Sequence, residues 1–68
     1  MDVATARANL RRAREAVTIA RFDLQQRRTP MNEARFAYAE RVVDDFERIV
    51  AAAELAEEAA ERTPAPVA

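Results

Sequence analysis

Residues 26–33 read QRRTPMNE, and this stretch divides the chain into two helical halves. Pro30 has no backbone N–H to donate to the carbonyl four residues earlier, and its ring pushes Thr29 out of the α-helical region. Thr29 is also a favourable N-cap, Pro30 suits the first position of a helix, and Glu33 suits the first turn. The stretch therefore predicts the end of one helix and the start of another.

The residues before this break repeat every seven positions. Large apolar side chains occupy heptad position a, and alanines follow three residues later at position d. The a residues are Val3, Leu10, Val17 and Leu24, and the d residues are Ala6, Ala13 and Ala20. Such a repeat is typical of a helix that packs closely against another helix. With Asp2 as N-cap, we predict a first helix over about residues 3–28.

The residues after the break carry a wider apolar stripe with the spacing of a helix. Its members are Phe36, Ala39, Val42, Val43, Phe46, Ile49, Val50, Ala53 and Ala56. Prolines at 64 and 66 end the pattern. We therefore predict a second helix over about residues 30–62 and a disordered C-terminal tail over residues 63–68.

One continuous, kinked helix is the alternative, because the seven-residue arginine spacing stays in phase from Arg28 to Arg35. The missing glycine cap after the first helix also counts against a turn. However, continuing the first register would place Arg41, Asp45 and Arg48 in the apolar seam. The sequence thus favours an all-α, coiled-coil-like antiparallel hairpin over residues 1–62, with its turn at about 28–30.

The hairpin prediction assigns a core and a set of paired charges. The predicted core packs Val3, Leu10, Val17 and Leu24 against Phe36, Val43, Phe46 and Val50. The predicted ion pairs are Arg7 with Glu54, Arg14 with Glu47, Arg21 with Glu40 and Arg28 with Glu33. The residue numbers of each pair sum to 61, as an antiparallel register requires, and all eight residues occupy e positions beside the seam. An exposed pair contributes only about 0.2–1 kcal/mol, so the charges specify register more than they stabilise.

Several large apolar residues remain outside this core. They are Ile19, Phe22, Tyr38, Val42, Ile49 and Leu55. A 68-residue chain is near the lower size limit for a single stable core, and half of its apolar residues are alanine. We expect these six residues to form a protein interface, either in a homodimeric four-helix bundle or against a different protein.

The composition argues against chemistry carried by the chain itself. The sequence contains no Cys and no His, so it offers neither a thiolate nor an imidazole as nucleophile, base or metal ligand. We predict no metal, no cofactor, no small-molecule substrate and no enzymatic activity. The longest apolar run, residues 49–53, is far too short to cross a membrane, and the N-terminus lacks the pattern of a signal peptide. The expectation is a cytoplasmic protein without membrane contact.

The sequence thus predicts a small protein-interaction module, acting as an adaptor, regulator or assembly component of bacterial or phage origin. A nucleic-acid-binding regulator that uses the arginine-rich first helix is the alternative. The arginines left without predicted glutamate partners near this helix are Arg11, Arg12 and Arg27. A net charge of −1 and a pI near 5.4 count against this alternative.

Overall fold

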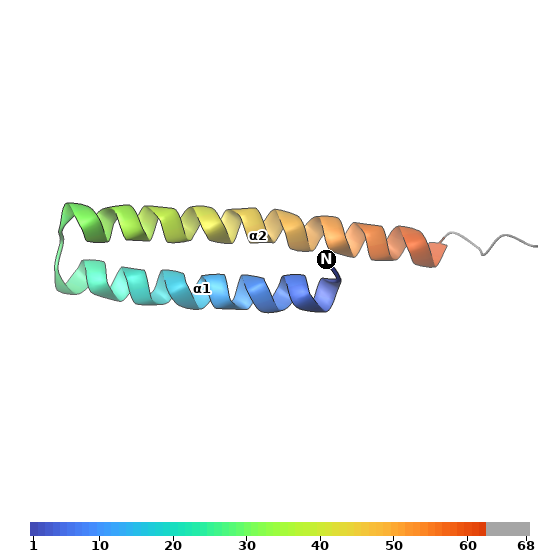
Figure 1. Cartoon of the computed structure of the whole chain (residues 1–68), viewed down its shortest axis with the longest axis horizontal. Coiled ribbons are helices and arrows are strands. Elements are labelled where there is room, and N and C mark those ends of the chain that lie inside the picture. The colour runs from blue at the N-terminus through green and yellow to red at the C-terminus, as the bar shows by residue number, and fades with distance from the viewer. Residues whose placement is uncertain (63–68) are drawn as a thin grey trace, which may run out of the picture.

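The computed structural model describes residues 1–62 and consists of two α-helices that lie side by side in opposite directions (Figure 1). Helix α1 comprises Val3–Gln26 and helix α2 comprises Pro30–Arg62. The prediction of an all-α hairpin is confirmed, and the continuous-helix alternative is wrong. The predicted tail at residues 63–68 lies outside the described residues.

Asp2 caps the N-terminus of α1, as its position in the sequence predicts. Its Oδ1 accepts a hydrogen bond from the backbone N–H of Thr5 at 2.7 Å, and its carbonyl accepts from the N–H of Ala6 at 3.0 Å. These bonds satisfy donors that have no partner within the helix. Hydrogen bonding by Thr5, through its side chain and then its backbone amide, holds the pKa of the Asp2 carboxyl below its ordinary value.

Helix α1 ends at Gln26, two residues before the predicted end. The backbone of Arg27 is extended, with φ −152° and ψ 110°, and its N–H still donates to the carbonyl of Asp23 at 2.9 Å. The chain must reverse direction before α2 begins at Pro30, and only residues 27–29 are available for this reversal. Arg27 and Arg28 were predicted to be helical, but they form part of the connection instead.

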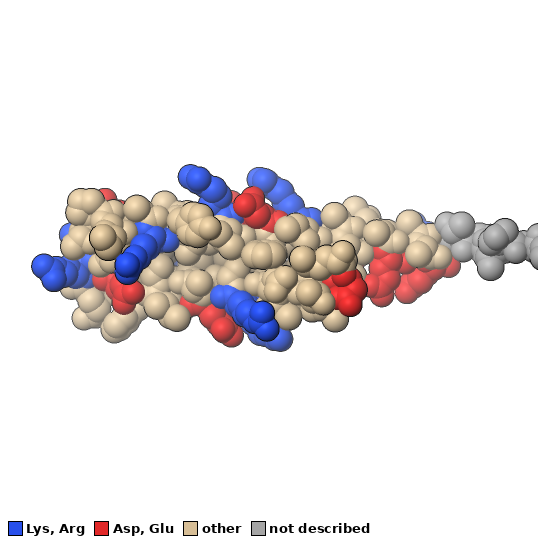
Figure 2. Space-filling model, in the orientation of Figure 1, with Lys and Arg blue, Asp and Glu red and all other residues tan. Residues whose placement is uncertain are grey.

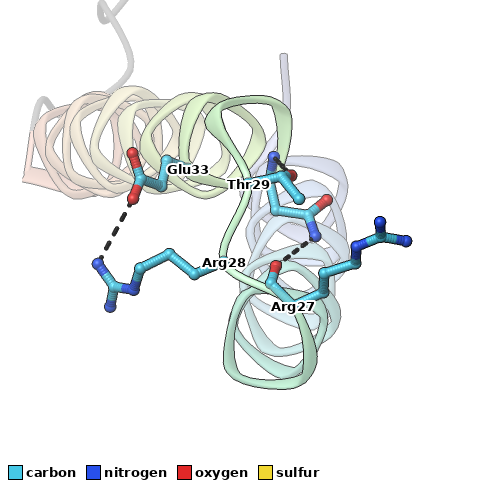
Figure 3. A network of polar contacts seen from close by, with 5 residues as sticks. Arg27, Arg28, Thr29 and Glu33 are labelled. Carbon is cyan, nitrogen blue, oxygen red and sulfur yellow. Dashed lines mark hydrogen bonds and ion pairs between the residues drawn. The ribbon is translucent and has the colours of Figure 1, made fainter.

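Asn32 performs the role that a glycine cap would otherwise have at the end of α1. Its side-chain amide donates to the carbonyl of Arg27 at 2.8 Å (Figure 3). The same amide donates to the carbonyl of Asp23 at 3.4 Å. Its backbone N–H in turn donates to the hydroxyl of Thr29 at 3.1 Å, which is the N-cap bond of α2. One residue of α2 thus satisfies carbonyls at the end of α1 and fixes how the two helices meet.

Small residues occupy the centre of the interface between the helices. The buried residues are Ala6, Leu10, Ala13, Ala20, Ala39 and Val50. The other predicted core residues are only half-buried: Val3, Val17, Leu24, Phe36, Val43 and Phe46. Two helices can enclose only the line along which they touch, so four alanines, Leu10 and Val50 fill this line while the other large side chains lie at its margins. No large side chain among the described residues is fully buried.

The two helices differ in length. Helix α2 has 33 residues and α1 has 24, so α2 is longer by nine residues, or about 14 Å. The turn holds the C-terminus of α1 beside the N-terminus of α2, so this extra length projects beyond the N-terminus of α1 (Figure 1). The last turns of α2 therefore lie outside the helix pair.

Candidate interaction surface

The hairpin has a charged face, formed by the e positions of both helices. The guanidinium of Arg7 lies 3.6 Å from the Glu54 carboxylate, that of Arg14 lies 4.0 Å from Glu47, and that of Arg28 lies 3.5 Å from Glu33. The last pair closes the turn (Figure 3). All six side chains are well exposed, so each pair contributes little energy but restricts the register of the helices.

Arg21 departs from this pattern. Within residues 1–62, no ion pair joins it to Glu40, the partner that the register assigns to it. Its guanidinium carbon instead lies 5.8 Å from the centroid of the Phe36 ring, which is a cation–π distance. Phe36 is half-buried at the seam and lies one helical turn before Glu40 in α2. Its exposed ring surface is therefore open to contact by Arg21. The register predicted an ion pair of Arg21 with Glu40, and the structure replaces it with this contact to the Phe36 ring.

The opposite side of the hairpin is an apolar face. In a helix the g positions flank the seam on the side away from the e positions, and the c positions adjoin g. Val42 and Ile49 occupy g positions of α2, Tyr38 occupies a c position of α2, and Ile19 occupies a c position of α1. Ile19 is 63% exposed and Tyr38 is 67% exposed, whereas Val42 is half-buried. We define the apolar face by these four residues.

Phe22 and Leu55 were also expected in this surface, but the helix geometry separates them from it. Both occupy f positions, which lie farthest from the seam, and they are 58% and 65% exposed. The predicted interface of six residues therefore divides into four that share one face and two that lie on the outer sides of the helices.

Two of the charged residues on the apolar face lie at its c positions, and sequence reasoning did not assign them to this face. Arg12 occupies a c position of α1 and Asp45 occupies a c position of α2, and both are exposed. The Asp45 carboxylate lies 3.9 Å from the guanidinium of Arg48, one turn further along the same helix. The signal that could have found Arg12 and Asp45 is their heptad position, which they share with Ile19 and Tyr38.

The three arginines considered for nucleic-acid binding do not form one patch. Arg11, Arg12 and Arg27 are all exposed. Arg11 and Arg12 are separated from Arg27 by about fifteen residues, which is roughly 20 Å along the helix. Along the paired part of the hairpin, basic and acidic side chains are interspersed on the face visible in Figure 2. A continuous basic stripe of the kind that follows a phosphate backbone is not visible on that face.

Acidic side chains gather where α2 projects past α1. A shallow groove at this open end is lined by Asp2, Arg7, Glu54, Glu57, Glu58 and Glu61, among others. Among residues 1–62, no group of three or more His, Cys, Asp or Glu residues is placed to hold a metal ion. Neither α1 nor the described part of α2 combines the length and apolar character needed to cross a membrane.

No protein-family model matches the sequence, and no curated protein and no solved structure matches it either.

Proposed function

We propose that the chain is a small protein-interaction module whose binding surface is the apolar face, and that it self-associates into a four-helix bundle. One observation carries this proposal. Ile19 and Tyr38 are about two-thirds exposed on the same face as Ile49, and within residues 1–62 only two helices exist to cover them. Contiguous exposed apolar side chains on one side of a small protein are typical of an interaction site.

The energetics of the seam support the same proposal. Burying a large apolar side chain contributes roughly 1.5–3 kcal/mol, but six of the eight predicted core residues are only half-buried. A second pair of helices over the apolar face would cover these four side chains and the adjoining margin of the seam. The resulting two-layer arrangement is a common architecture for helical hairpins of this length.

The charged face has a different role in this proposal. Three of its arginines form ion pairs with glutamates within the chain and Arg21 lies over the Phe36 ring, so these side chains gain little from a further protein and remain favourable in water. The module would thus bind through one face only. Such one-sided binding suits an adaptor, regulator or assembly component, which joins chains without performing chemistry.

A single substitution tests whether the apolar face mediates association. Ile49→Glu places a carboxylate in the centre of the face, and we expect it to reduce the solution mass to that of one chain while helicity is retained. The matched control is Ala51→Glu, which adds the same charge at an exposed position on the charged side of α2. Light scattering after size exclusion, over a concentration series, measures the mass. An Ile49→Glu mass equal to that of the wild type would contradict the proposal.

A further inference from the structure

We infer that the apolar face binds a second copy of this chain with both turns at the same end, so that α1 of each copy packs against α2 of the other. This inference rests on the proposed function and specifies the partner and its orientation. It follows from the charges of the two helices and from the level at which their residues meet.

The two helices carry opposite net charges. Helix α1 contains five arginines and two acidic residues, for a net charge of +3, whereas α2 contains four arginines and nine acidic residues, for −5. Two-fold symmetry can bring the apolar faces together in two ways. An axis along the hairpin stacks each α1 on the α2 of the other copy, and an axis across the hairpin stacks α1 on α1 and α2 on α2. Charge complementarity favours the first arrangement.

The contacts within one hairpin show which residues of α1 and α2 lie at the same level, meaning the same position along the long axis of the hairpin. Residue numbers sum to 61 for the ion pair of Arg7 with Glu54 and to 57 for the cation–π pair of Arg21 with Phe36. Leu10 and Val50, which pack in one buried cluster, sum to 60. A two-fold axis along the hairpin leaves these levels unchanged. Residues of α1 and of the second copy's α2 should therefore be neighbours when their numbers sum to 57–61.

This rule makes the apolar face complementary to itself. Ile19 meets Tyr38 of the second copy at a sum of 57 and Val42 of the second copy at 61. Arg12 meets Asp45 of the second copy, also at 57. The symmetry produces each of these contacts twice. Within residues 1–62, Arg12 is the one cation and Asp45 the one anion at the c positions of this face. The same-end dimer thus sets the Arg12 of each copy opposite the Asp45 of the other.

Charge reversal tests the contact between Arg12 and Asp45. In a same-end dimer of the Arg12→Asp variant, the new carboxylate faces Asp45 of the other copy at both contacts. In a same-end dimer of the Asp45→Arg variant, the new guanidinium faces Arg12 of the other copy at both contacts. We expect each variant to dimerise about tenfold more weakly than the wild type at low salt. In a heterodimer of the two variants, one contact sets the new Asp against the new Arg and the other is the native contact of Arg12 with Asp45, so we expect an equimolar mixture to dimerise with about wild-type affinity. Arg11→Asp is the matched control, because its neighbouring position b lies on the charged side of α1.

Spin labels test the orientation independently. The chain contains no cysteine, so Arg27→Cys provides a single labelling site at the turn. Turns at the same end place the two labels on the order of 20 Å apart, the width of a four-helix bundle. Turns at opposite ends separate them by about the length of α1, which is roughly 36 Å. Pulsed electron paramagnetic resonance distinguishes these distances.

The outcomes separate this inference from the proposed function. Short label distances with affinity restored in the mixture support the same-end dimer. Long label distances, or a mixture as weak as its components, overturn it. The apolar face would nevertheless stand as the interface if Ile49→Glu still abolished the dimer. A wild-type chain that is folded and has the mass of a monomer at all concentrations overturns the same-end dimer altogether.

Discussion

The charged and apolar faces of this hairpin use the same helices but differ in what completes them. On the charged face, two ion pairs and one cation–π contact join α1 to α2, and a third ion pair joins the turn to α2. On the apolar face, Ile19 and Tyr38 remain about two-thirds exposed. One face thus aligns the two helices, and the other is the face through which we propose that the pair binds. The proposal therefore predicts that substitutions can change alignment and binding separately in such a small fold.

Removing a side chain from the seam should have the largest effect, because both faces depend on it. Leu10 is buried with Ala6 and Val50, and we expect Leu10→Ala to reduce the free energy of unfolding by about 2–5 kcal/mol. Urea unfolding followed by circular dichroism measures this loss. Leu55→Ala is the control, since Leu55 is 65% exposed, and it should change stability by less than about 0.5 kcal/mol. Equal losses for the two variants would contradict the assigned seam.

The turn fixes the lengthwise alignment of α1 and α2, and both faces depend on this alignment. Weakening the turn should therefore destabilise the whole hairpin. Asn32→Ala removes the side-chain donor to the carbonyls of Arg27 and Asp23, and we expect a loss of about 0.5–1.5 kcal/mol. The same experiment on Gln25→Ala, an exposed residue in the last turn of α1, serves as control. An Asn32→Ala protein as stable as this control would show that the amide does not cap α1.

A charge reversal tests the alignment role of the charged face more gently. Arg14→Glu opposes a second carboxylate to Glu47, and we expect a loss of about 0.2–1 kcal/mol that decreases in high salt. Adding Glu47→Arg restores an ion pair of opposite polarity and should recover most of the loss. The double-mutant cycle is measured by thermal unfolding in low and high salt. Equal effects of the second substitution with and without the first would exclude coupling between the two residues.

The smallest expected effect concerns pH and the start of α1. Because the folded state lowers the pKa of Asp2, the unfolded chain takes up this proton more readily. The stabilisation is therefore present above the unfolded pKa near 4 and is lost as the pH falls through the folded pKa. Asp2→Asn keeps a capping side chain but cannot titrate, so it should lose slightly less stability than the wild type between pH 7 and pH 2. Identical acid sensitivities in thermal unfolding would contradict this contribution.

Most of the fold could be predicted from the sequence because its signals are local. The break at Pro30, the N-cap at Asp2 and the slip of the apolar stripe each involve residues close together in the chain. The role of Asn32 could not be read in the same way. Its amide bonds to carbonyls five and nine residues earlier, across a turn whose geometry exists only once both helices are in place.

The candidate surfaces were predicted less completely than the fold. The heptad pattern identified the partners of Arg7, Arg14 and Arg28, but it assigned Arg21 to Glu40, whereas the Arg21 guanidinium lies over the Phe36 ring. It also assigned the core to large residues such as Val17 and Phe46, which the structure leaves half-buried. The pattern shows which side of each helix faces the seam. It does not show how little of that side two helices can cover.

The unequal spacing of the cross-hairpin ion pairs along the chain has a consequence for the order of folding. Arg28 and Glu33 are separated by five residues, Arg14 and Glu47 by 33, and Arg7 and Glu54 by 47. The entropy lost on closing a loop grows with its length, by about 0.6 kcal/mol for each doubling. The contacts at the turn are therefore the easiest to form, and each one shortens the loop that remains for the next. We expect the hairpin to form like a zipper from Thr29 outward, and to open first at the end where α2 stands alone.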